Sequence, residues 1–182
     1  MKKTLVVVLS ISFLAVAGCS KRNSNASGQL GNFNSCFTGE SNSTDPTTGG
    51  ARKLDIVKGE VIGGIERYPS GQKKTETHFK NGRMNGNSTE WHENGQKKLD
   101  VNYKDDKAEG LVTRWYKNGQ QESETHYTDG KKNGLMTIWF ENGQKQSEIN
   151  YKDDKVDGSA IEWFENGQVK RKGIFKDGNL IE

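Results

Sequence analysis

Hydrophobic residues are scarce in this sequence. They make up 30% of the chain, whereas 22 of the 182 residues are glycine. Such a composition is typical of disordered chains when the residues follow no period. Here glycine and aromatic residues recur at fixed spacing, so the composition indicates a thin sheet with little buried interior.

Neither sign of charge is in clear excess. The 27 basic residues fall to 25 once Lys2 and Lys3 are removed with a leader, against 24 acidic residues. The basic residues form no stripe along the repeats. The sequence therefore offers no support for nucleic-acid binding.

The motifs of common enzymes and metal sites are also missing. There is no Gly-x-Ser-x-Gly elbow and no phosphate-binding loop. His78 and His126 occupy the same repeat position two repeats apart, about 19 Å from each other at ordinary strand spacing, which is too far to share a metal. Acidic segments at 103–110 and 151–158 lack the alternating ligands of an EF-hand, and aspartate is favoured in turns. We predict no catalytic residue, metal, cofactor or small-molecule substrate.

What the sequence does contain is a 24-residue repeat. The segment 139–144, with the sequence Trp-Phe-Glu-Asn-Gly-Gln, has three counterparts, and all four tryptophans of the chain lie in this position. Asn-Gly is a strong signal for a hairpin turn, and its glycines are predicted to adopt positive φ. The structural positions of the repeat are Trp91, Trp115, Trp139, Trp163, Gly95, Gly119, Gly143 and Gly167.

Each repeat follows the order strand, turn, strand, turn, and no segment shows helical periodicity. A second glycine opens the first strand, an aromatic residue ends the second, and an Asp or Gly turn follows. The predicted fold is all-β: an elongated antiparallel sheet of stacked 24-residue β-hairpins over residues 53–182. The first repeat is atypical, with Arg-Tyr-Pro-Ser-Gly-Gln at 67–72, as expected of a terminal cap.

Loop length decides which side chains share a face of the sheet. A two-residue Asn-Gly loop would place Trp91 opposite Lys98, with the aromatic column on the other face. A three-residue Glu-Asn-Gly loop would place Trp91 opposite Lys97 and gather the apolar residues on one face. The second arrangement buries more apolar surface, so we predict it, with Trp139 on the same face as Tyr151.

The N-terminus has the features of a targeting segment. Two lysines precede a mostly apolar stretch at 5–17, which identifies residues 1–18 as a signal peptide. The small residues before Cys19 resemble the lipobox of bacterial lipoproteins. This resemblance implies that Cys19 carries the lipid and anchors the protein to a membrane, and Ser20 implies the outer membrane. An ordinary signal peptide with an incidental cysteine is the alternative.

Residues 19–52 are rich in Ser, Asn, Thr and Gly, which predicts a flexible, disordered tether. Cys36 lies within it. With Cys19 lipidated, Cys36 would have no partner in the chain, leaving a free thiol or an intermolecular disulfide.

The repeats resemble the bacterial variant of the MORN repeat over residues 58–182. That variant is a small β-hairpin with Trp or Tyr before Asn-Gly, an aromatic residue after the second strand, and an acidic or glycine turn. The resemblance implies a non-catalytic binding or scaffold module. Bacterial proteins with such repeats include lipoproteins and a family labelled as antitoxins, so the alternative function is an immunity protein that neutralises a toxin through the repeat surface.

Strand 135–140 is apolar on both sides, unlike strand 87–92. Contiguous exposed apolar residues usually mark interaction sites, so we predict a protein-binding surface opposite the tryptophans. Alternatively, Phe33 and Phe37 of the tether cover these residues, or curvature buries them. The predicted partner-binding residues are Val112, Tyr116, Met136, Ile138, Phe140 and Phe164. Together these features predict a lipid-anchored binding module of the bacterial cell envelope.

Overall fold

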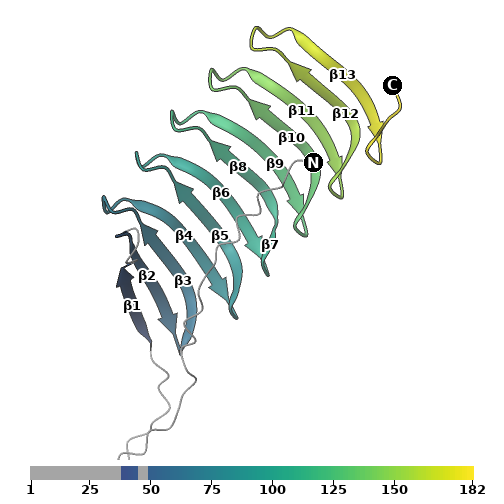
Figure 1. The fold of residues 1–182 in the computed structure, drawn as a ribbon. Coiled ribbons are helices and arrows are strands. Elements are labelled where there is room, and N and C mark those ends of the chain that lie inside the picture. Colours follow the sequence, from purple (N-terminus) through teal and green to yellow (C-terminus); the bar gives the residue numbers. More distant parts are fainter. Residues whose placement is uncertain (1–37, 45–48) are drawn as a thin grey trace, which may run out of the picture.

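The computed structural model describes residues 38–44 and 49–182, and these form a single antiparallel sheet of 14 strands without a helix in the described ranges (Figure 1). The strands are β1 (Gly39–Thr44), β2 (Ala51–Val57), β3 (Glu60–Arg67), β4 (Lys73–Lys80), β5 (Arg83–Trp91), β6 (Lys97–Lys104), β7 (Lys107–Ala108), β8 (Gly110–Trp115), β9 (Gln121–Thr128), β10 (Lys131–Trp139), β11 (Lys145–Lys152), β12 (Lys155–Trp163), β13 (Val169–Lys176) and β14 (Asn179–Leu180). Successive strands are neighbours, except that the short β7 pairs with β6 beside β8. The predicted all-β fold of stacked hairpins is confirmed.

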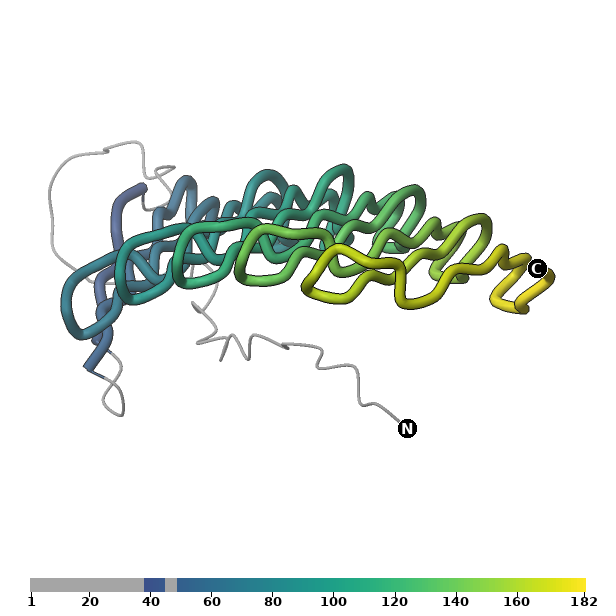
Figure 2. The backbone as a smooth tube through the Cα atoms, turned by 90° about the horizontal axis from the view of Figure 1, so that it is seen from above, coloured from purple at the N-terminus to yellow at the C-terminus, as the bar shows by residue number. Residues whose placement is uncertain are grey.

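The sheet is long and thin. The N-terminal strands lie at one end and the C-terminus at the other (Figure 2). Only three hydrophobic residues of the described chain are buried: Ile56, Val101 and Val112. Stability therefore depends on contacts between neighbouring strands, as in other repeat proteins. No helix among the described residues is long and apolar enough to cross a membrane.

The Asn-Gly loops contain three residues, as predicted. In the β10–β11 hairpin the N–H of Phe140 donates to the Gln144 carbonyl (2.8 Å), and the N–H of Gly143 donates to the Phe140 carbonyl (2.9 Å). Gly143 has φ +83° and Gly119 has φ +86°, which confirms the predicted positive φ. This is a tight turn followed by a left-handed glycine, a standard three-residue hairpin connection.

The recurrence of Asn and Gln follows from contacts within and between loops. The side-chain oxygen of Asn94 accepts the backbone N–H of Gln96 (3.1 Å), which holds its own loop, and its amide nitrogen donates to the Lys117 carbonyl of the next loop (2.7 Å). A Cβ atom at Gly119 would approach Gln96 Nε2 to 3.1 Å. Glycine is thus needed for φ, and its lack of a side chain lets the end of the preceding glutamine pack close to it.

Two-residue turns occupy the opposite edge of the sheet. Asp105 and Asp106 have φ +49° and +68°, and two successive residues with positive φ characterise the tight hairpin turn that matches strand twist. The Asp106 carboxylate accepts the N–H of Met84 at 2.8 Å, so it also joins adjacent repeats. No cluster of three or more His, Cys, Asp or Glu suited to a metal occurs within residues 38–44 and 49–182.

A β-bulge that the sequence analysis did not anticipate follows each three-residue loop. Trp139 pairs with Lys145, but Ile138 pairs with Ser147, so Gln146 is an extra residue in β11. The same shift occurs in the other hairpins with this loop. A bulge reverses the alternation of side chains beyond it.

Because of the bulge, the side chains share faces differently from the prediction. Tyr151 pairs with Gly134, which places it with Met136 and Ile138, on the face opposite Trp139. The prediction that Trp139 and Tyr151 share a face is therefore wrong, although the loop length is right. The physical reason is that the extra residue in β11 interrupts strict alternation between the loop and the aromatic column.

We call the two sides of the sheet the tryptophan face and the tyrosine face, after the residues that define them. The tryptophan face carries Trp91, Trp115, Trp139 and Trp163, and the tyrosine face carries Phe79, Tyr103, Tyr127, Tyr151 and Phe175. Val101 and Val112 lie on the tyrosine face and are only 4% and 8% exposed. Apolar residues thus occur on both faces: the two valines are buried on the tyrosine face, whereas Leu111 and Leu135 lie with the tryptophans.

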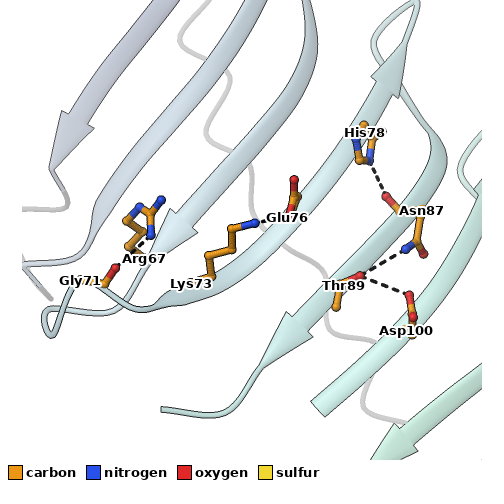
Figure 3. Close-up of polar contacts among 8 residues, drawn as sticks. All are labelled: Arg67, Gly71, Lys73, Glu76, His78, Asn87, Thr89 and Asp100. Carbon is orange, nitrogen blue, oxygen red and sulfur yellow. Dashed lines mark hydrogen bonds and ion pairs between the residues drawn. The ribbon is translucent and has the colours of Figure 1, made fainter. Parts of the chain in front are cut away.

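Polar side chains accompany the tryptophans on their face. Buried Thr89 lies opposite Asp100 and donates to its carboxylate (3.2 Å), while Asn87 donates to Thr89 (3.3 Å), as Figure 3 shows. Burial acts to raise the pKa of Asp100, but hydrogen bonds from Lys97, Asn87 and Thr89 outweigh it and lower that pKa. Lys97 also lies over the Trp115 ring, 5.6 Å from its centroid.

The first hairpin differs as its sequence suggests. Arg67 takes the position of tryptophan and donates to the carbonyl of Gly71 in its own loop (3.0 Å; Figure 3).

Before this hairpin, β2 pairs along its length with β1. Because β1 lies within 19–52, the sheet begins earlier than the predicted repeat domain at 53–182. The predicted signal peptide at 1–18, lipidated Cys19 and Cys36 lie outside the described residues.

Candidate functional site

The residue that follows each tryptophan position closes the three-residue loop on the tyrosine face. We number only the hairpins that have a three-residue loop. In the first three of them (β3–β4, β5–β6 and β8–β9), this residue reaches across to the next hairpin and donates a hydrogen bond to the backbone carbonyl of the tryptophan there. The contacts are Tyr68 Oη to Trp91 O (2.8 Å), His92 Nε2 to Trp115 O (2.9 Å) and Tyr116 Oη to Trp139 O (2.7 Å). Since a carbonyl only accepts, Nε2 of His92 carries the proton in this contact.

The series stops at the fourth hairpin. Phe140 occupies the closing position there, and its ring has no hydrogen-bond donor. The carbonyl of Trp163 consequently lacks the side-chain hydroxyl or imidazole that the three preceding tryptophan carbonyls receive. Phe164 follows in the fifth hairpin, so the last two closing residues are both apolar.

A hollow of about 460 Å³ opens on the tyrosine face between these two phenylalanines. It is open to solvent and does not form an enclosed cavity. Phe164 is 49% exposed, which is unusually open for an aromatic ring in a chain with so few apolar residues. The hollow is lined by Ile138, Phe140, Gln146, Ser147, Ile149, Glu162, Trp163, Phe164, Glu165 and Lys170.

The charges beside the hollow are largely paired. Glu162 accepts from Arg171 at 2.5 Å and lies 3.9 Å from the Lys170 ammonium. The hydrogen bond from Arg171 lowers the pKa of the Glu162 carboxyl. Lys170 also stands 5.8 Å from the centroid of the Phe164 ring. The hollow therefore combines aromatic and aliphatic residues with polar ones, of which Glu162 and Lys170 are paired and Glu165 has no ion-pair partner among the described residues.

The structure brings together only part of the predicted partner-binding set. Ile138, Phe140 and Phe164 line the hollow. Val112 shares their face but is buried, and the Tyr116 hydroxyl is already bound to Trp139. Met136 and Tyr116 are half-buried and, like Val112, are not among the lining residues.

The sequence does not identify Ser147, Ile149 and Lys170 as site residues, because the bulges in β11 and β13 change which face of the sheet their side chains occupy. One pattern could have revealed the bulge. Lys145 bonds Glu148 at 2.5 Å, although residues three apart in an unbroken strand point to opposite faces. Similar pairs, Lys73 with Glu76 and Lys97 with Asp100, recur in other repeats.

Comparison with known proteins agrees with the repeat architecture. The MORN repeat variant matches four segments, at residues 84–105, 108–129, 132–153 and 156–177. The repeats of this family are in general non-enzymatic modules that bind proteins or membranes. No curated protein matches the sequence.

Among solved structures, a chain of a GtfA/B complex bound to UDP and GlcNAc aligns with 78% of this chain at 19% identity and a TM-score of 0.24. The aligned part is 24% of that chain, so this protein spans about a quarter of its length. Such a distant likeness carries no inference about function. The four matched segments cover most of β5 to β13, and this part of the protein is accordingly built on repeats of the MORN variant family.

Proposed function

We propose that this protein is a non-catalytic binding module, anchored by lipid to a bacterial envelope membrane, that holds a protein partner on the tyrosine face around Phe140 and Phe164. The observation that carries this proposal is the hollow between these two rings, which is lined by apolar and polar residues in equal number. Its combination of aromatic anchors and a polar rim is typical of the centre of protein interfaces.

The anchoring part rests on the sequence. The small residues that precede Cys19 motivate lipid attachment there, and Ser20 favours the outer membrane. The tether would allow the repeat sheet to reach a partner at some distance from the membrane. A toxin could be that partner, in which case the protein would act as an antitoxin or immunity protein; a neighbouring toxin gene, or toxicity on deletion, would distinguish this role.

Crosslinking in the native cell, followed by identification of the captured protein, tests the proposal. Binding of that protein is then compared between the full-length wild type and the variant Ile138→Lys/Phe140→Ser. Leu135→Lys is the matched control, because Leu135 lies in the same strand on the tryptophan face and is 41% exposed. We expect the double variant to lose binding and the control to keep it. Undiminished binding by a folded double variant would rule out this face.

A further inference from the structure

We propose that the hollow between Phe140 and Phe164 receives a tyrosine side chain from the partner protein, whose phenolic hydroxyl donates to the backbone carbonyl of Trp163. This inference rests on the proposed function and specifies the chemistry of the partner. It concerns one side chain and one acceptor atom, so it can fail while the binding role stands.

The chain itself displays this interaction. Tyr116 lies on the tyrosine face at the loop edge and places its hydroxyl 2.7 Å from the carbonyl of Trp139, and Tyr68 does the same at 2.8 Å for Trp91. The carbonyl of Trp163 occupies the equivalent position in the next repeat. Since Phe140 cannot donate, this side-chain hydrogen bond is not made within the chain, and a donor from another molecule would complete the series.

The lining suits an aromatic ring. Ile138 and Ile149 lie on this face beside the two phenylalanines, and all four residues line the hollow. Aromatic rings prefer edge-to-face or offset contact with other rings, and tyrosine combines an apolar body with a polar tip. A ring placed between Phe140 and Phe164 would thus bury its apolar body while its hydroxyl reaches the backbone.

The charge balance disfavours an anionic occupant. The lining cation Lys170 and the nearby Arg171 already pair with Glu162, whereas Glu165, which also lines the hollow, has no ion-pair partner among the described residues. Taking a charge out of water without a partner is costly. A neutral hydrogen-bond donor on an aromatic ring avoids this cost.

The test uses N-acetyl-L-tyrosinamide and N-acetyl-L-phenylalaninamide, which differ only in the hydroxyl. Each is titrated into ¹⁵N-labelled full-length protein, and backbone amide shifts are followed by NMR. We expect saturable shifts at Ser147, Ile149 and Phe164, with the tyrosine compound binding about five-fold more tightly, as one net hydrogen bond provides. Equal affinities, or shifts elsewhere, would overturn the proposal.

Phe140→Tyr is the decisive variant, because it restores the hydroxyl present at Tyr116 and lets the chain satisfy its own carbonyl. We expect it to fold like the wild type and to lose the preference for the tyrosine compound. Leu135→Tyr, which adds the same hydroxyl on the other face of β10, should leave the preference unchanged. A preference that persists in Phe140→Tyr would contradict the assigned acceptor.

The same variant separates this inference from the proposed function. If the crosslinked partner is lost in Ile138→Lys/Phe140→Ser but binds Phe140→Tyr normally, the surface is right and the tyrosine assignment is wrong. If the partner binds both variants normally, the proposed function itself fails. Loss of the partner in both variants supports both proposals.

Discussion

Replacing Gly143 by valine tests whether the three-residue loop needs a left-handed residue. Gly143 has φ +83°, and a Cβ atom built on it would meet Gln120 Oε1 at 3.4 Å and Cδ at 3.8 Å. These are ordinary contacts with the end of a flexible side chain. The cost of the substitution therefore comes from the backbone conformation, with little contribution from a clash.

The magnitude follows from two opposing effects. A β-branched residue in the left-handed region costs about 2–3 kcal/mol, the upper part of the range for strained backbone. Loss of glycine also reduces the entropy of the unfolded chain, which offsets roughly 0.4–1 kcal/mol of that cost. We expect Gly143→Val to lower the free energy of unfolding by about 1–2 kcal/mol.

Urea unfolding followed by tryptophan fluorescence measures this loss. With a slope of about 2 kcal/mol/M, the midpoint should fall by roughly 0.5–1 M. Gly143→Asn is the control, since asparagine tolerates positive φ better than valine, and it should lose clearly less. An unchanged midpoint for the valine variant, or equal losses for both, would refute the role assigned to φ at this position.

Three further predictions address other parts of the molecule. Tyr116→Phe should cost about 1 kcal/mol in thermal unfolding, because it removes the part-buried hydrogen bond to Trp139; a melting temperature equal to that of the wild type would show that the bridge is not stabilising. All five tyrosines have a pKa raised by burial. The folded state thus keeps the phenol protonated at a pH where the unfolded chain ionises. This stabilisation is intact below pH about 10 and is lost as the pH rises through the higher folded-state values. Stability that stays constant from pH 9 upward would contradict this expectation. Cys19→Ala should leave the precursor unprocessed or release the protein from the membrane, which fractionation and mass measurement would detect; normal processing and partitioning would exclude lipidation at this residue.

The repeat period and both kinds of turn could be read directly from the residues. Asn-Gly and Asp-Gly pairs impose local backbone conformations that need little help from the rest of the chain. Gly119 and Gly143 have the expected positive φ, and the loop hydrogen bonds follow the expected three-residue pattern. Local steric rules were sufficient at these positions.

The distribution of side chains between the faces could not be read in the same way. With strict alternation, a three-residue loop places Val101 and Ile149 on the side of the tryptophans, but the bulges beyond the loops place them with Val112 and Met136. The bulged residues, such as Lys98 and Gln146, are ordinary polar residues without a glycine or proline to mark them. The position of a bulge depends on the pairing of two strands, which a single strand does not specify.

The candidate site was only partly predictable for the same reason. Phe140, Phe164 and Ile138 were recognisable because they interrupt an otherwise polar pattern. Ile149 and Lys170 join them only through the register of β11 and β13. The contrast between Tyr116 and Phe140 became meaningful only once the carbonyl that Tyr116 binds was located, 23 residues further along the chain.

The sequence by itself determined the period, the turns and the all-β architecture, because each depends on φ preferences and on alternation within a few residues. The tertiary structure decided which side chains share a face and where the hollow lies. Both depend on hydrogen-bond register between strands, and a shift of one residue in that register moves every following side chain to the other side of the sheet.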